Sequence, residues 1–84
     1  MSQVYTHAYL MGIRDGRALL ATHERATGSA CTLDDARQFL DNCKACLAMG
    51  FTGETRDAIK GEADFWRGWI KRHIATRRAW NVAA

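Results

Sequence analysis

Residues 32–50, TLDDARQFLDNCKACLAMG, carry the signals of one complete helix, from its N-cap to its stop. Thr32 and Asp35 stand three residues apart, which is the spacing of a capping box with Asp in place of the usual Glu. Apolar side chains then recur at helical spacing. Gly50 suits the left-handed residue that follows the end of a helix. The sequence therefore predicts a short helix over residues 33–49.

A longer helix is expected on each side of this one. The first should cover residues 2–26, with Ser2 as a possible N-cap and Gly28 as its stop. The other should cover residues 53–79, with acidic side chains in its first turns and arginines in its last, as the helix dipole favours. The chain has no proline, so the strongest helix breaker is missing. We expect an all-α fold, a three-helix antiparallel hairpin or bundle in the order long, short, long.

The 84 residues suffice for a single helical domain, expected over residues 1–80 and followed by a disordered tail at 81–84. A domain this small buries a modest core and usually needs a disulfide, a metal or a partner subunit. Three cysteines and no recognisable secretion signal or membrane span point to a reducing, cytoplasmic location, where a disulfide framework is not expected. We therefore predict a homodimer, which would cover the remaining apolar surface.

Two glycines four residues apart, Gly12 and Gly16, lie on the apolar face of the first helix. Glycine inside a helix costs roughly 1 kcal/mol relative to alanine, so a pair of them needs a reason. The favoured reason is a close helix crossing, with Trp66 or Trp69 filling the notch. A notch for a ligand is the less favoured alternative.

Aromatic side chains are concentrated in the third helix, and some apolar residues lie off the main apolar arcs. Tryptophan and arginine are frequent in binding hot spots, so part of this set is predicted to contact a partner, although a core role is the plainer interpretation. The predicted partner-binding residues are Phe65, Trp66, Trp69, Trp80, Leu10 and Met11.

A basic stripe follows one side of the third helix. Its members are Arg56, Lys60, Arg67, Lys71 and Arg78. A stripe of this kind suits a solvated surface, an acidic protein partner or the phosphates of a nucleic acid. Because the second helix is acidic and no helix-turn-helix signature is evident, nucleic-acid binding is the weaker of the two binding interpretations.

The CxxC formed by Cys43 and Cys46 is a weak candidate for a metal or redox site. It falls near the end of a helix, where the dipole opposes a thiolate, and no second ligand pair has matching spacing. Buried apolar cysteines are the favoured interpretation. We therefore expect no metal and no cofactor, and without a recognisable catalytic arrangement we expect no enzymatic activity.

Two segments, GIRDGRALL at residues 12–20 and GEADFWRGWIKR at residues 61–72, resemble the short helical accessory proteins of temperate phages and prophages. The resemblance implies a protein of the host bacterial cytoplasm that binds and redirects a host or phage protein. The leading expectation is a small protein-binding module, such as a modulator of a host complex. The alternative is a nucleic-acid-associated regulator that uses the basic stripe.

Overall fold

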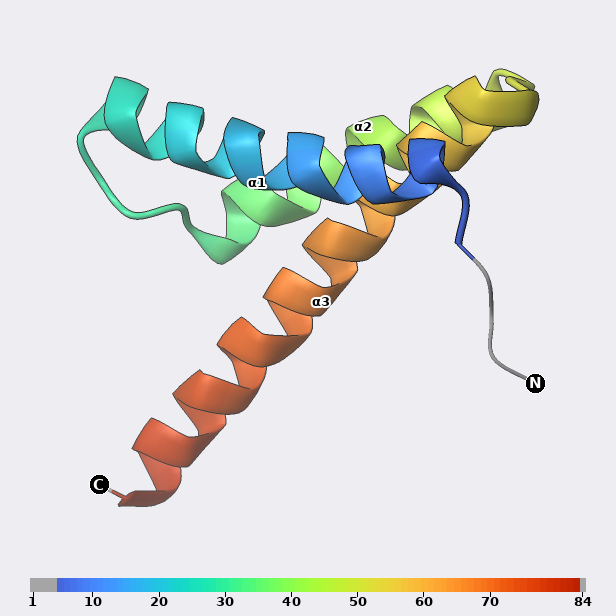
Figure 1. The fold of residues 1–84 in the computed structure, drawn as a ribbon. Coiled ribbons are helices and arrows are strands. Elements are labelled where there is room, and N and C mark those ends of the chain that lie inside the picture. The colour runs from blue at the N-terminus through green and yellow to red at the C-terminus, as the bar shows by residue number, and fades with distance from the viewer. Residues whose placement is uncertain (1–4, 84) are drawn as a thin grey trace.

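The computed structural model describes the backbone of residues 5–83 and the side chains of residues 5–80, and it is all-α (Figure 1). It contains the helices α1 (His7–Thr27), α2 (Leu33–Ala48) and α3 (Gly53–Ala83), with no strand among the described residues. The predicted fold class and the order long, short, long are confirmed, with 21, 16 and 31 residues in turn. No described helix is long and apolar enough to cross a membrane.

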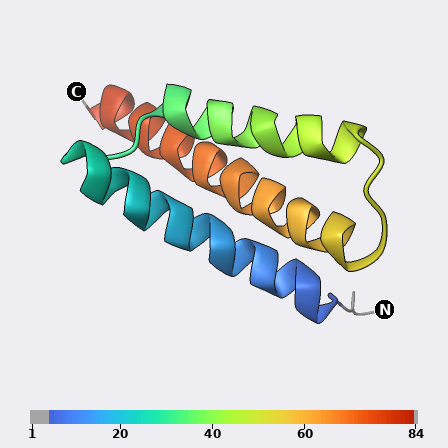
Figure 2. The same cartoon turned by 90° about the horizontal axis from the view of Figure 1, so that it is seen from above.

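The third helix lies between the other two (Figure 2). Both α1 and α2 pack on α3, whereas α1 and α2 approach each other only through side chains near their connecting loop. Within the expected three-helix arrangement, α3 is therefore the central helix. The physical reason is that the apolar face of α3 is broad enough to be covered from two sides, with Phe65 facing α1 and Trp66 stacked on Phe39 of α2.

Capping residues set most of the helix ends. Thr32 and Asp35 form the predicted capping box, with each side chain accepting from the backbone N–H of the other residue. Gly28 ends α1 in the left-handed region at φ 68°, as expected. The N-cap of α1 is Thr6, so the predicted start near Ser2, a residue outside the described part, is wrong. The Thr6 hydroxyl also donates to Asp57 of α3, a tertiary contact that fixes this end.

The turn between α2 and α3 contains two glycines in the left-handed region, Gly50 at φ 87° and Gly53 at φ 64°. Only glycine adopts this conformation without strain, so the predicted helix stop at Gly50 is confirmed. At its other end α3 continues to Ala83, beyond the predicted end at residue 79. The expected tail at 81–84 is therefore helical as far as Ala83, and Ala84 lies outside the described residues. No proline or glycine stands in this last segment to stop the helix.

The α1–α3 crossing is close enough for backbone to touch backbone. A Cβ atom on Gly12 would overlap the carbonyl oxygen of Ala58, and one on Gly61 would overlap that of Tyr9. At Gly16 a Cβ would lie 2.7 Å from a ring carbon of Phe65. Gly12 and Gly16 thus lie at a close crossing, but the ring over the notch belongs to Phe65 and not to Trp66 or Trp69.

The core is small and centred on Trp66, whose side chain is fully buried. Its ring stacks on Phe39 with 4.8 Å between centroids and makes T-shaped contacts with Phe65 and Trp69. The other buried members have smaller side chains than Trp66, and all but Leu40 are alanine or cysteine: Cys31, Ala36, Leu40, Cys43 and Ala63. The stability of the fold therefore depends heavily on a single indole ring.

Candidate functional site

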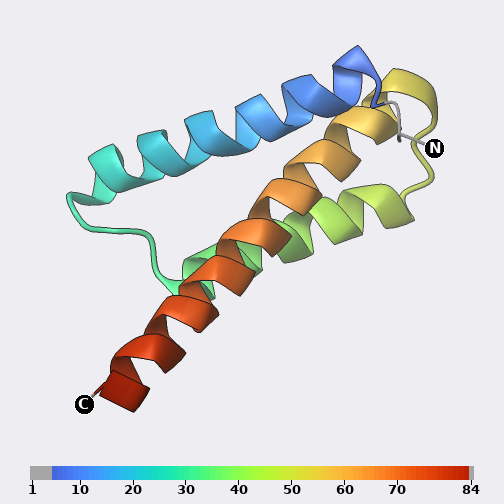
Figure 3. The same cartoon turned by 60° about the horizontal axis from the view of Figure 1, so that its bottom comes forward.

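The C-terminal part of α3 projects beyond the loop that joins α1 to α2 (Figure 3). Residues 75–80 are all exposed. Trp80 is 74% exposed, among the most exposed of the large apolar side chains in the described part of the chain. Trp80 lies on the same side of α3 as the half-buried Trp69 and His73, which precede it by eleven and seven residues. This projecting end is an amphipathic helix whose apolar side is covered by α1 and α2 over only part of its length.

The projecting end is also strongly basic. Residues 65–84 contain no Asp or Glu. The cations of this segment are Arg67, Lys71, Arg72, Arg77 and Arg78. Arg67 pairs with Asp64 at 2.8 Å, and Asp64 is the last acidic residue of the chain. Beyond that pair, the segment therefore combines positive charge, with no acidic residue of its own, and an exposed indole.

The residues predicted to contact a partner do not share one environment. Trp66 is fully buried, so its predicted role at an interface is wrong, because the ring fills the space between α2 and α3. Phe65 covers Gly16, and Trp69 stacks on His73 with 4.8 Å between ring centroids. Both Phe65 and Trp69 are half-buried, as is Met11. Most of the predicted set therefore contributes to the fold of the single chain.

Leu10 and Trp80 are both exposed, at 51% and 74%, but they do not form one surface. Leu10 follows Tyr9, which meets α3 at Gly61. Trp80 lies nineteen residues beyond Gly61, which is about 28 Å along the helix. The single docking patch of tryptophan, arginine, Leu10 and Met11 expected from the sequence is therefore divided between two ends of the molecule.

The predicted basic stripe is exposed over its whole length of about 33 Å. Its members, Arg56, Lys60, Arg67, Lys71 and Arg78, differ in their surroundings. Asp57 and Asp64 accompany the first three, whereas Lys71 and Arg78 have only cations and neutral residues nearby in the sequence. The positive field is thus concentrated at the projecting end.

The CxxC borders a cavity of about 310 Å³ between the three helices. Burial, with Glu62 nearby, raises the pKa of the Cys43 thiol to about 11. Neither a reactive thiolate nor a ligand pair is favoured there, because an apolar setting opposes the charged form of the thiol. The lining residues are Leu19, Phe39, Asn42, Cys43, Cys46, Ile59 and Glu62.

The carboxyl of Glu62 on the wall of this cavity gives the fold a pH dependence. Burial, followed by the charge of Asp15, raises its pKa above the ordinary 4.5. A raised pKa in the folded state means that ionisation of this carboxyl disfavours folding. The free energy of unfolding therefore falls as the pH rises from the pKa of Glu62 in the unfolded state through its pKa in the folded state. We expect Glu62→Gln to raise the melting temperature at pH 7. The gain should vanish below about pH 4, where Glu62 is protonated in both states. An equal gain at both pH values in calorimetry would contradict this explanation.

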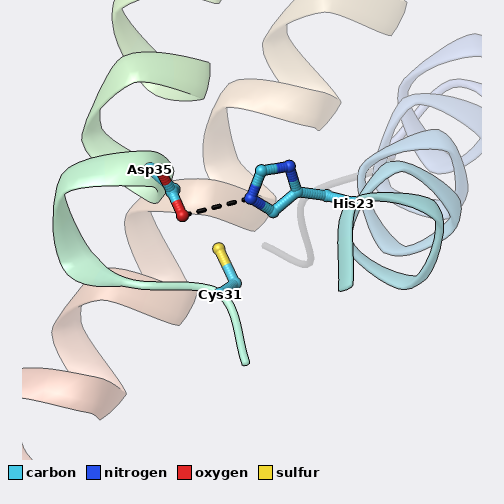
Figure 4. Close-up of side chains that lie close together, drawn as sticks. All are labelled: His23, Cys31 and Asp35. Carbon is cyan, nitrogen blue, oxygen red and sulfur yellow. Dashed lines mark hydrogen bonds and ion pairs between the residues drawn. The ribbon is translucent and has the colours of Figure 1, made fainter. Parts of the chain in front are cut away.

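A second cluster joins the end of α1 to the start of α2 (Figure 4). His23 Nε2 lies 3.1 Å from Asp35 Oδ2, and the potential ligand atoms of His23, Cys31 and Asp35 all lie within 4.8 Å of one another. The hydrogen bond with His23 is the main cause that lowers the pKa of the Asp35 carboxyl. Burial raises the pKa of the Cys31 thiol, and the nearby carboxylates of Asp35 and Glu24 add to this effect.

Sequence reasoning did not assemble this cluster. In the sequence, Asp35 stands out only through its place in the capping box, and no ligand spacing links it to His23 or Cys31. The available signal was the helix stop at Gly28, because a chain that reverses there brings residues shortly before and after the turn together.

Comparisons of the chain with protein-family models, with curated proteins and with solved structures find no match. The fold and the two candidate sites therefore carry the functional argument.

Proposed function

We propose that this chain is a non-enzymatic protein-binding module whose projecting α3 end docks into a groove on another protein. The observation that supports the proposal is the position of Trp80, which is 74% exposed on a helix end whose charged residues are all cations. An exposed indole flanked by arginines has the composition of a binding hot spot. An amphipathic helix presented in this way suits the helix-in-groove mode of recognition.

The charge of the projecting end indicates the chemistry of the partner. Lys71, Arg72, Arg77 and Arg78 favour a groove with an apolar floor for Trp80 and acidic residues at its rim. A second copy of this chain is disfavoured at this surface, because two such ends would bring like charges together. A protein that redirects a host complex, as the resemblance to phage accessory proteins implies, would require a surface of this kind.

Site-specific photo-crosslinking in the native cell tests the proposal. A photoreactive amino acid replaces Ala79, beside Trp80, and in a matched variant it replaces Ala45, an exposed alanine of α2. We expect a protein crosslink from position 79, resistant to nuclease, whose crosslinked peptide is rich in Asp or Glu. Trp80→Ala, or Arg77→Glu with Arg78→Glu, should reduce its yield at least about tenfold, the effect expected for an interfacial hot spot.

Three results would contradict this proposal. Equal capture from positions 79 and 45 would show that the α3 end has no special role. Loss of capture after nuclease treatment would favour the alternative, a nucleic-acid regulator in which the cations contact phosphates and Trp80 stacks on a base. A crosslink between two copies from position 79 would place a homodimer interface there.

The predicted homodimer is a separate proposal that requires another surface. Leu10, at the opposite end of α3 from Trp80, is the exposed apolar residue of α1 that suits it. Sedimentation equilibrium should give a dimer for the wild type and a monomer for Leu10→Glu. A wild-type monomer at micromolar concentration would exclude this proposal without affecting the docking of α3.

A further inference from the structure

We propose that His23, Cys31 and Asp35 form a binding site for a zinc ion that links the end of α1 to the start of α2. Each residue offers one ligand atom, and these atoms lie within 4.8 Å of one another. The set of an imidazole nitrogen, a thiol sulfur and a carboxylate oxygen matches the ligands that zinc takes in proteins. Magnesium and calcium prefer sites made of oxygen alone, so the sulfur selects against them.

The orientation of the side chains favours a metal site over a nucleophilic cysteine. In a relay of cysteine, histidine and aspartate, the imidazole lies between the thiol and the carboxylate and uses one nitrogen for each. Here the Cys31 sulfur and the Asp35 carboxylate lie on the same side of the His23 ring, the side of Nε2, and Nδ1 points away (Figure 4). All three donors therefore converge on one point, as ligands of a common ion do.

Little movement is needed for the three atoms to reach coordination distance. Ligands bonded to a tetrahedral zinc at roughly 2.0–2.3 Å lie about 3.5 Å from one another. His23 and Asp35 are already 3.1 Å apart, and the Cys31 sulfur lies within 4.8 Å of both, so a shift of at most about 1.3 Å by the sulfur completes the set. The fourth position is left for water, since three protein ligands are typical of zinc sites with an open position.

The surroundings already hold each ligand in place. The backbone N–H of Cys31 donates to the Glu24 carboxylate at 3.0 Å, which fixes the loop to α1. The His23 ring contacts Phe39 edge-on, with 5.2 Å between centroids. The Cys31 side chain is almost fully buried, at 4% exposure, and so lies within the fold near its two partners. Such supporting contacts orient the ligands before the ion arrives.

A bound ion would supply the link that a chain of this size needs. The helices α1 and α2 both pack on α3 and meet each other only through side chains near this loop, so their relative position depends on the loop and on α3. Zinc that binds only the folded chain raises its stability in proportion to the logarithm of the free zinc concentration. This role is independent of the docking proposed for Trp80, more than 40 residues away in the sequence.

Zinc chloride titrations with the reduced full-length chain test the site. We expect one zinc per chain by elemental analysis and an increase in melting temperature with zinc but not with magnesium. Cys31→Ser and His23→Gln should each weaken zinc binding by more than about 100-fold. A loss of about 100-fold is the largest expected when a residue only supports a ligand, so a greater loss identifies a direct ligand. The matched variants Cys46→Ser and His7→Gln, which change the same residue types outside the cluster, should bind as the wild type does.

X-ray absorption at the zinc edge of the wild-type protein gives a result that does not depend on a variant that folds. We expect one sulfur at about 2.3 Å and nitrogen or oxygen ligands at about 2.0–2.1 Å. Two sulfurs would assign the ion to Cys43 and Cys46 and overturn the proposal. So would zinc binding that survives Cys31→Ser, or a wild-type chain that binds no zinc.

Discussion

Gly12→Ala is expected to lower the free energy of unfolding by about 3 kcal/mol, although alanine is the better helix former. The added Cβ would overlap the carbonyl oxygen of Ala58, a backbone atom that cannot rotate away as a side chain can. The whole of α1 would therefore have to move off α3, which would loosen the contacts of its neighbours. Urea denaturation followed by circular dichroism measures the change.

Gly68→Ala is the matched control, since Gly68 is also a glycine inside a helix. There the nearest atom to an added Cβ is the guanidinium nitrogen of Arg72 at 3.2 Å, the far end of a flexible side chain. We expect this variant to be more stable than the wild type by about 0.5–1 kcal/mol.

Gly61→Ala, on the other side of the crossing, should destabilise as Gly12→Ala does. The double variant should lose less than the sum of the two, because the helices separate only once. A Gly12→Ala protein as stable as Gly68→Ala would rule out the close crossing.

Trp66→Ala is expected to cost about 3–5 kcal/mol, the range for truncation of a fully buried large aromatic side chain. A domain of this length is stabilised by about 4–13 kcal/mol in total, so the variant should be partly or wholly unfolded at 37 °C. The reason is that the ring contacts Phe39, Phe65 and Trp69, and these rings are held in the helix packing and cannot all move into the space that it leaves.

Two further variants separate the contributions of this ring. Trp80→Ala removes an indole from the exposed end of the same helix and should change stability by no more than about 0.5 kcal/mol. Trp66→Phe keeps an aromatic ring and deletes the buried Nε1–H, which has no hydrogen-bond partner among the described residues. Since an unpaired buried donor itself costs stability, Trp66→Phe should lose far less than Trp66→Ala. Equal losses for Trp66→Ala and Trp80→Ala in thermal melts would contradict the assignment of the core.

The parts of the fold that sequence reasoning predicted well are those set by local chemistry. The capping box at Thr32 and the stops at Gly28 and Gly50 depend on neighbours within a few residues, and all are present. The start of α1 was misplaced because Thr6 is fixed by Asp57, fifty-one residues away. The position of α3 between the other helices could not be predicted from helical periodicity, which gives the apolar face but not what covers it.

The candidate sites show the same division. The exposed cations and Trp80 at the end of α3 follow from composition and helical spacing. The burial of Trp66 does not, since the sequence gives no measure of how much of a broad apolar face the neighbouring helices cover. The cluster of His23, Cys31 and Asp35 depends on the path of the loop between α1 and α2, and no spacing rule for metal ligands describes that path.

The position of α3 between its neighbours has a consequence for synthesis of the protein on the ribosome. The first two helices emerge before the third, yet each has its packing surface on the third. Isolated helices of 21 and 16 residues are marginal in water, so the nascent chain should stay largely unfolded until translation has passed α3. Folding should therefore occur in one late step after release of α3 from the exit tunnel, with the earlier segments available to chaperones until then.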